Sequence, residues 1–200
     1  LLALSAERVC QESRLAMQGG FPGYYWHTLK ELGKLHLWHK ELADLVGVPA
    51  GPPQHHGEPD SFVHTMMTLN FFNRWPADEK TEILRWAALL HDLGKGVTPR
   101  EKWPSHPGHD ETGVPLVEAF CDRLRLPNNI KKAAMLACRE HMRVHVFLEM
   151  RKTKWVDVVQ DAEKTAMGAA GLAQVCKADV MGRKAHEYDC SGAEALEAVI

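Results

Sequence analysis

The sequence predicts an all-α fold, a bundle of helices with a short helical segment at its N-terminus. Apolar residues recur at helical spacing along most of the 200 residues, and no convincing alternation of β-branched residues is found. Hydrophobic residues make up 45% and charged residues 25% of the chain, the balance of an ordinary globular protein. This composition excludes extensive disorder and fibrous proteins. No stretch reaches the roughly 18 apolar residues of a membrane span.

Three short helices are expected before a stretch rich in chain breakers. They lie at residues 5–19, 24–32 and 35–45. Ser5 is suited to cap the first helix, and Gly33 to stop the second. Residues 47–59 then contain four prolines and three glycines, too many for a regular element. We therefore divide the chain here, into a helical segment at residues 1–50 and a second domain at residues 51–200.

Seven further helices are expected in the second domain. They lie at residues 60–71, 76–94, 114–126, 128–147, 153–164 and 172–181, with a last one beginning at Ser191. The helix over residues 76–94 is apolar almost all round, so we expect it at the centre of the bundle. A polar, proline-rich loop at residues 95–107 is long enough to be a lid or a substrate loop.

Cysteine usage and the beginning of the chain favour the cytoplasm. The five cysteines are odd in number and never form a Cys-x-x-Cys pair, so neither a disulfide framework nor a thiolate zinc site is expected. The chain begins at Leu1 and has neither the basic segment nor the cleavage site of a signal peptide. We therefore expect an internal fragment of a cytoplasmic protein.

Charge is almost balanced overall, at −2, but it is unevenly distributed. Residues 123–154 contain nine basic and two acidic residues, a local charge of +7. This basic run is either a route for RNA or a solvated helix face that keeps the domain soluble. Arg139 and Arg143 lie one helical turn apart in it, beside His141 and His145. Part of the positive field would therefore lie near any site built on these histidines.

Three of the expected helices each carry an imidazole or a carboxylate on an apolar face. His91 and Asp92 end the most apolar helix, Asp179 lies on the apolar stripe of residues 172–181, and His64 follows the cap Asp60. A buried carboxylate needs a cation. Imidazoles and carboxylates together suit Zn, Mn, Fe, Co, Ni or Mg. The alternative is structural: a histidine bonded to a carbonyl, and an aspartate paired with Lys or Arg.

The order of these four residues resembles the H…HD…D pattern of HD-superfamily metal-dependent phosphohydrolases. From about Leu4 to Arg183 the chain is also similar to the C-terminal portion of bacterial multifunctional CCA-adding proteins, which are tRNA nucleotidyltransferases with an HD domain. The motifs that carry this similarity are His56-Gly57-Glu58, His91-Asp92-Leu93-Gly94-Lys95, Trp103-Pro104, His109 with Gly113, and Ala178-Asp179-Val180. The chain departs from the family at Gly57, where proline is usual, at the inserted Pro59, and at Pro115 near an expected helix start.

The resemblance implies a set of site residues and a cofactor. The implied metal ligands are His64, His91, Asp92 and Asp179, with His109 and His141 at positions that hold a second ion in several relatives. One or two divalent ions, Ni, Mn, Mg or Zn, are the expected cofactor. Catalytic roles are expected for Asp92, His91 and Lys95, and phosphate binding for Lys95, Arg183 and Arg139. Lys95 could equally neutralise the end of its helix.

The implied activities are those of a 2′,3′-cyclic phosphodiesterase, a 2′-nucleotidase and a phosphatase. The expected partners are a phosphate ester or cyclic nucleotide as substrate, with tRNA and a second copy of the chain as further candidates and no membrane. Adding CCA needs an Asp-x-Asp pair for two Mg ions, and the chain has none, so the nucleotidyltransferase head is absent. The competing hypothesis is a module that binds the tRNA body or a second subunit, with a structural metal.

The remaining histidines carry weaker expectations. His145 shares a helix face with His141 at a spacing that permits joint ligation, and an interfacial role is the alternative. Five others match no motif and are expected on the surface or in packing: His27, His36, His39, His55 and His186.

Overall fold

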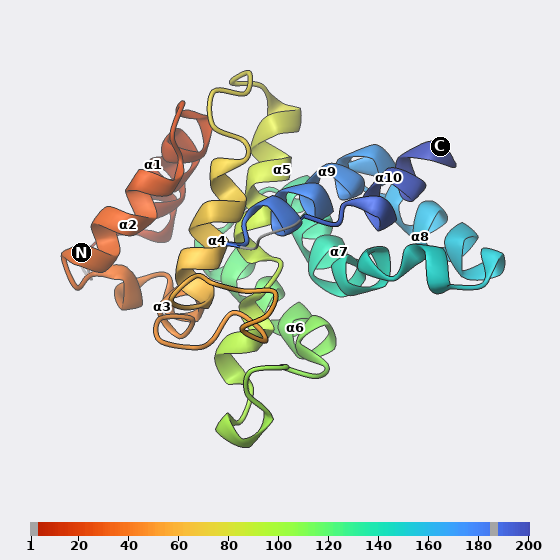
Figure 1. The fold of residues 1–200 in the computed structure, drawn as a ribbon. Coiled ribbons are helices and arrows are strands. Elements are labelled where there is room, and N and C mark those ends of the chain that lie inside the picture. Colours follow the sequence, from red (N-terminus) through yellow and green to blue (C-terminus); the bar gives the residue numbers. More distant parts are fainter. Residues whose placement is uncertain (1–3, 185–187) are drawn as a thin grey trace.

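The computed structural model describes residues 4–184 and 188–200, and these residues form ten α-helices without a β-strand (Figure 1). The helices are α1 (Ala6–Gln18), α2 (Gly23–Glu31), α3 (Lys40–Ala43), α4 (Ser61–Asn70), α5 (Glu79–Leu90), α6 (His109–Leu124), α7 (Asn128–His145), α8 (Lys152–Glu163), α9 (Gly168–Met181) and α10 (Ser191–Ala198). The all-α prediction is confirmed. His186 and the first three residues, on which the expected internal start rests, lie outside the described residues.

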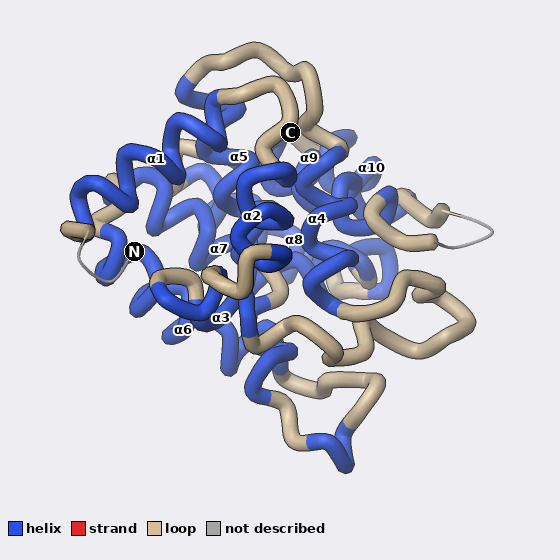
Figure 2. Tube along the Cα trace, turned by 90° about the vertical axis from the view of Figure 1, so that its left-hand side faces the viewer, coloured by secondary structure: helices blue, strands red, loops and turns tan. Residues whose placement is uncertain are grey.

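Short 3-10 turns connect several of these helices, at Leu35–Leu37, Leu93–Val97, Arg100–Lys102 and Phe147–Glu149. Most of the predicted loop at residues 95–107 extends away from the bundle, at the bottom of Figure 1. Helices and connecting segments alternate throughout the tube view, in which α1 and α2 lie along one side of the bundle (Figure 2). None of the described helices is both long and apolar enough to cross a bilayer.

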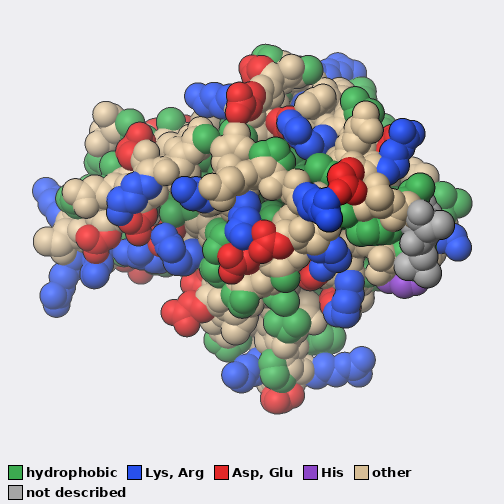
Figure 3. Space-filling model, turned by 180° about the vertical axis from the view of Figure 1, so that it is seen from behind, with side chains coloured by type: hydrophobic (Ala, Val, Ile, Leu, Met, Phe, Trp, Pro, Cys, Tyr) green, Lys and Arg blue, Asp and Glu red, His purple; other side chains and the backbone are tan. Residues whose placement is uncertain are grey.

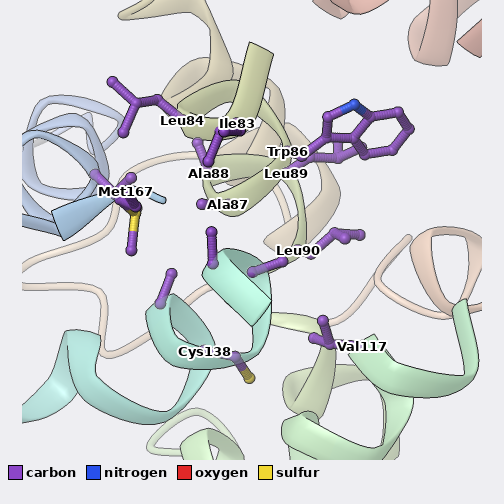
Figure 4. Close-up of a cluster of buried hydrophobic side chains, with 14 of the residues drawn as sticks. Ile83, Leu84, Trp86, Ala87, Ala88, Leu89, Leu90, Val117, Cys138 and Met167 are labelled. Carbon is purple, nitrogen blue, oxygen red and sulfur yellow. The ribbon is translucent and has the colours of Figure 1, made fainter. Parts of the chain in front are cut away.

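Helix α5 is the centre of the bundle, as its sequence predicts. Every residue from Thr81 to Leu90 is buried. In Figure 4, Met167, which precedes α9, and Val117 of α6 lie near the side chains of α5, whereas Cys138 lies on the side of α7 that faces away from α5. A helix surrounded on all sides must be apolar on all sides, and this accounts for the composition of residues 83–90.

The predicted helix starts at Ser5 and Asp60 carry side-chain caps. Asp60 Oδ1 accepts a hydrogen bond from the main-chain N–H of Val63 at 2.8 Å, and Ser5 accepts one from Arg8. At the start of α5, Asp78 does the same for Thr81 at 2.7 Å. Each cap satisfies a main-chain donor that the first helical turn leaves free, and contributes about 1 kcal/mol.

Helix α6 begins five residues earlier than predicted. The predicted start lies near residue 114, next to Pro115. Instead α6 begins at His109, after Gly108 in the left-handed region at φ 76°, and Pro115 lies inside the helix. Asp110 and Glu111 occupy the first turn, where the helix dipole favours acidic side chains. Helix α9 likewise begins earlier, at Gly168.

The predicted helix over residues 35–45 is wrong as a continuous element. The structure has a 3-10 turn and then the single turn of α3, separated at His39, whose φ of −127° and ψ of 50° are not helical. The His39 ring is buried against Trp26 and Phe120, with ring centroids 4.8 and 5.9 Å apart. Packing of this ring overrides the local helical preference.

The N-terminal segment shares one hydrophobic core with the later helices. Trp26 of α2 contacts Trp86 of α5, with ring centroids 5.8 Å apart. Arg85 of α5 is fully buried, and its guanidinium donates to the carbonyls of Met17 at 2.6 Å and Phe72 at 2.7 Å. The division of the chain at residue 50 stays a prediction.

Burial of His39 makes stability depend on pH. Desolvation lowers the pKa of His39 to about 3, from an ordinary value near 6.5. Because the unfolded chain takes up this proton first, the stabilisation is complete above pH 6.5 and is lost as pH falls towards 3. We expect the unfolding free energy of the native chain, relative to His39→Leu, to fall by about 2 kcal/mol between pH 7 and pH 5. Urea titrations at both pH values measure this, and a difference that does not vary with pH contradicts it.

Candidate metal centre

Six predicted site residues converge on one buried cluster. Helix α4 contributes one of them, the end of α5 two, the start of α6 one, α7 one and α9 one. No side chain in this group is more than 5% exposed. We call this group the His-Asp cluster: His64, His91, Asp92, His109, His141 and Asp179.

One half of the cluster lies around Asp179. His64 Nε2 is 2.8 Å from Asp179 Oδ1 and 3.6 Å from Asp92 Oδ2. His91 Nε2 is 3.2 Å from the same Asp92 oxygen and 3.7 Å from Asp179 Oδ1. Two imidazole nitrogens and two carboxylate oxygens from α4, the end of α5 and α9 therefore face a common point.

The other half lies around the second oxygen of Asp92. His109 Nε2 is 3.1 Å from Asp92 Oδ1, and His141 Nε2 is 3.5 Å from it. The two Nε2 atoms are 3.1 Å apart. Asp92 is thus common to both halves, one oxygen facing each. The geometry offers either one metal site or two sites that share this carboxylate.

Main-chain carbonyls orient three of the imidazoles in the same way. Nδ1 lies 2.8 Å from a carbonyl oxygen in each, with Ala88 as the partner of His91, His106 that of His109, and Cys138 that of His141. A carbonyl can only accept, so Nδ1 carries the hydrogen and Nε2 presents its lone pair to the cluster.

The orientation leaves polar atoms that a cation would satisfy. His91 Nε2 and Asp92 Oδ1 are buried without a hydrogen bond of good geometry, and Asp92 Oδ2 has the Lys95 ammonium at 2.7 Å. His109 and His141 present lone pairs to each other across 3.1 Å. Burying such groups uncompensated is costly, so the donor set fits a divalent ion.

The electrostatics of the cluster favour a positive charge at its centre. Burial by itself raises the pKa of Asp92, but His91 and Lys95 outweigh it and hold that pKa well below its usual range. Burial lowers the pKa of His91, but Asp92 and Asp179 raise it to about 10. Without a metal, a proton on His91 supplies the charge. Burial lowers the pKa of His141 to about 4, so this ring is neutral and suited to ligation at pH 7.

Gly94 allows α6 to start beside Asp92. A Cβ atom at this position would lie 1.9 Å from the carbonyl oxygen of His109, a distance that no side chain can accept. The 3-10 turn after α5 therefore passes directly against the first residue of α6. This close approach brings His109 Nε2 to Asp92.

Lys95 is buried beside Asp92. Its Nζ donates to the carbonyl of Ala50 at 2.7 Å and pairs with Asp92 Oδ2 at 2.7 Å, and the residue is buried. The expected catalytic and phosphate-binding roles of Lys95 stay predictions. In the structure its ammonium balances the charge of Asp92.

Arg139 is not part of the cluster. Its guanidinium pairs with Glu140 at 2.9 Å and with Asp161 of α8 at 3.3 Å. Two residues along a helix correspond to a rotation of about 200°, so Arg139 and His141 lie on opposite sides of α7. The expected role of Arg139 in phosphate binding gains no support from this position.

Arg183 and His145 form the accessible edge of the cluster. Arg183 Nη2 is 3.4 Å from Asp179 Oδ2, and His145 Nε2 is 2.5 Å from the same oxygen. Their side chains are 23% and 17% exposed, more than those of the six cluster residues. The phosphate-binding role expected of Arg183 stays a prediction. His145 was recognised only as a helix neighbour of His141, and its contact with Asp179 could not be inferred from that spacing.

Glu58 lies next to the cluster, although no role was expected for it from the sequence. Its carboxylate lies 2.6 Å from His56 Nδ1 and 3.1 Å from His64 Nδ1, and these three residues form a further group that could hold a metal ion. The resemblance placed Glu58 in a motif but assigned it no role. The only available signal was a His-x-Glu sequence in a loop.

The basic run at residues 123–154 is largely neutralised by carboxylates. Arg123 pairs with Glu41, and Lys131 with Asp122 at 2.8 Å and Glu118 at 3.1 Å. Seen from behind, basic and acidic side chains are interspersed over the surface (Figure 3). This pairing weakens the case for the run as a route for RNA.

The fold and the cluster define a class: all-α proteins whose helices enclose a centre of imidazoles and carboxylates. A family model described as the HD domain matches residues 61–168, and the chain belongs to this family. The matched range contains five of the six cluster residues, all except Asp179.

The sequence is also similar to curated proteins named Multifunctional CCA protein. It is 40% identical to the protein of Hahella chejuensis over 189 residues, which are 94% of this chain and 44% of that protein. Over 187 residues it is 39% identical to that of Thioalkalivibrio sulfidiphilus, and over 186 residues 38% identical to that of Pseudoalteromonas atlantica. The predicted resemblance is confirmed. The chain spans less than half the length of these relatives.

Proposed function

We propose that the chain is a metal-dependent phosphohydrolase domain acting as a 2′,3′-cyclic phosphodiesterase, 2′-nucleotidase and phosphatase. The observation that carries this proposal is the convergence of oriented Nε2 atoms on the two oxygens of Asp92. His64, His91, Asp92 and Asp179 would hold one ion. Asp92, His109 and His141 would hold a second.

The chain's own residues have distinct parts in this reaction. A bound divalent ion would lower the pKa of water and polarise a phosphoryl oxygen. Arg183 at the accessible edge is the proposed phosphate contact, since its guanidinium reaches past Asp179 and is partly exposed. Lys95 holds Asp92 in place and balances its charge. The burial of the six cluster residues excludes bulk water and strengthens each of these interactions.

The ligand chemistry narrows the choice of metal ion, and the relatives suggest a partner. Imidazoles mixed with carboxylates suit Ni, Mn, Mg or Zn. The relatives carry the name of CCA proteins, and this supports tRNA as a partner of the protein in which the chain acts, in the cytoplasm. A second copy of the chain remains a further candidate partner.

The proposal is tested by stripping the purified chain of metal and refilling it with Ni, Mn, Mg or Zn in turn. We expect hydrolysis of 2′,3′-cyclic AMP and of a chromogenic phosphate ester only after refilling with at least one of these ions. Bound metal with no turnover on either substrate would contradict the proposal. It would favour the alternative, a tRNA-body-binding or dimerisation module with a structural metal.

A further inference from the structure

We propose that Glu58 is a positioning residue of this centre, which orients His64 and joins the two helices that carry His64 and Asp179. The inference rests on the proposed function, because it concerns the same ions. It assigns a role to a side chain outside the six cluster residues.

The four imidazoles of the cluster are oriented in two different ways. His91, His109 and His141 each have a main-chain carbonyl 2.8 Å from Nδ1. Within the described part of the chain, His64 Nδ1 is buried and makes no hydrogen bond of good geometry, to a carbonyl or to any other group. The acceptor within reach is Glu58 Oε1, at 3.1 Å. His64 is thus the one ring of these four whose orienting group is a charged side chain.

The Glu58 carboxylate also contacts two other groups. Oε1 also contacts His56 Nδ1 at 2.6 Å, and Oε2 accepts a hydrogen bond from the main-chain N–H of Lys184 at 3.0 Å. Lys184 follows the end of α9, the helix that carries Asp179. One carboxylate therefore connects the segment before α4, the ligand on α4 and the end of α9.

The surroundings of the Glu58 carboxylate hold it in place. The Glu58 side chain is fully buried, so water does not compete for its oxygens. The segments are in close contact, because a Cβ at Gly57 would lie 2.6 Å from the carbonyl oxygen of Lys184. The carboxylate is therefore fixed before any ion binds.

Glu58 therefore sets the orientation and the electron density of the His64 ring through Nδ1, the nitrogen that faces away from the cluster. A carboxylate at the rear nitrogen of an imidazole fixes the ring and its tautomer and makes the front nitrogen a stronger donor. For His64 the front nitrogen is Nε2, which faces Asp179 Oδ1 at 2.8 Å. Losing such a partner typically weakens metal binding about 10-fold to 100-fold.

The test compares Glu58→Gln with Glu82→Gln. Glu82 is also a buried carboxylate, bound by Arg14 at 2.6 Å and Gln18 at 2.9 Å, away from the cluster. The affinity for Zn and for Mn is measured by competition with a chelator, and thermal unfolding of the metal-free chain is followed by circular dichroism. We expect Glu58→Gln to bind either ion about 10-fold to 100-fold more weakly. We expect Glu82→Gln to unfold at a lower temperature with unchanged affinity.

The outcomes separate this inference from the proposed function. If the native chain binds metal and Glu58→Gln binds it as tightly, the positioning role is wrong and the proposed function stands. If the native chain binds no metal, both are wrong. Should Glu58→Gln fail to fold, Glu58→Asp keeps the charge but shortens the reach, and native affinity in that variant would equally overturn the role.

Discussion

Replacing Asp92 with Asn is expected to abolish hydrolysis, with kcat/KM falling at least about 1,000-fold, or about 4 kcal/mol of transition-state stabilisation. The two oxygens of Asp92 face the two halves of the cluster. An amide keeps one acceptor, turns the other into a donor and removes the negative charge. Because Asn has nearly the same shape, we expect the helical circular dichroism spectrum at 20 °C to remain that of the native chain.

The matched control is Asp78→Asn on the same helix. Asp78 caps α5 by accepting from Thr81, and Asn caps helices about as well. Turnover in this variant is expected to equal that of the native chain. Undiminished turnover in Asp92→Asn, measured with 2′,3′-cyclic AMP in the metal-loaded enzyme, would mean that the cluster is structural.

Divalent ions are expected to stabilise the fold strongly. At a free ion concentration 100 times Kd, binding to the folded chain alone adds about 2.7 kcal/mol to the unfolding free energy. An ion is expected to bind the folded chain because the metal-free cluster buries the carboxylates of Asp92 and Asp179. Without a metal, a proton on His91 balances part of their charge. Urea titrations with and without Zn or Mn measure the increment.

The control for this increment is a chain with His91→Gln and Asp179→Asn. These changes remove one nitrogen and one carboxylate charge from the half of the cluster around Asp179. We expect the increment to fall below half its native value. An equal increment in both chains would place the ion somewhere else on the surface.

Much of the fold could be predicted because the helices follow local rules. Residues 83–90, apart from the buried Arg85, are apolar and form the central helix, and Asp60 stands where a cap is needed. The failures have local causes as well. His39 breaks the predicted third helix because its ring is packed between aromatic side chains, a tertiary effect that spacing does not report. Helix α6 was expected to begin near residue 114, but it begins at His109 and contains Pro115.

The cluster could be predicted in part, by two different routes. Buried faces pointed to His64, His91, Asp92 and Asp179, because an inward carboxylate needs a cation. His109 and His141 came from family resemblance alone, since their own helices gave no such signal. Glu58 was missed because it lies in a loop without periodicity and meets Lys184, 126 residues further along the chain.

The phosphate-binding roles of the three expected cations stay predictions. Each of them contacts a carboxylate in the structure: Lys95 pairs with Asp92, Arg139 with Glu140 and Asp161, and Arg183 with Asp179. Of the three, Arg183 is the one that lies at the accessible edge of the cluster.

The most direct test of the metal centre is anomalous X-ray diffraction from crystals of the chain loaded with Zn or Mn. The account predicts a peak at roughly 2.0–2.2 Å from Nε2 of His64 and His91 and from oxygens of Asp92 and Asp179. A second peak beside His109 and His141 would show that Asp92 bridges two ions. Full loading in solution with no anomalous peak among these side chains would contradict the account.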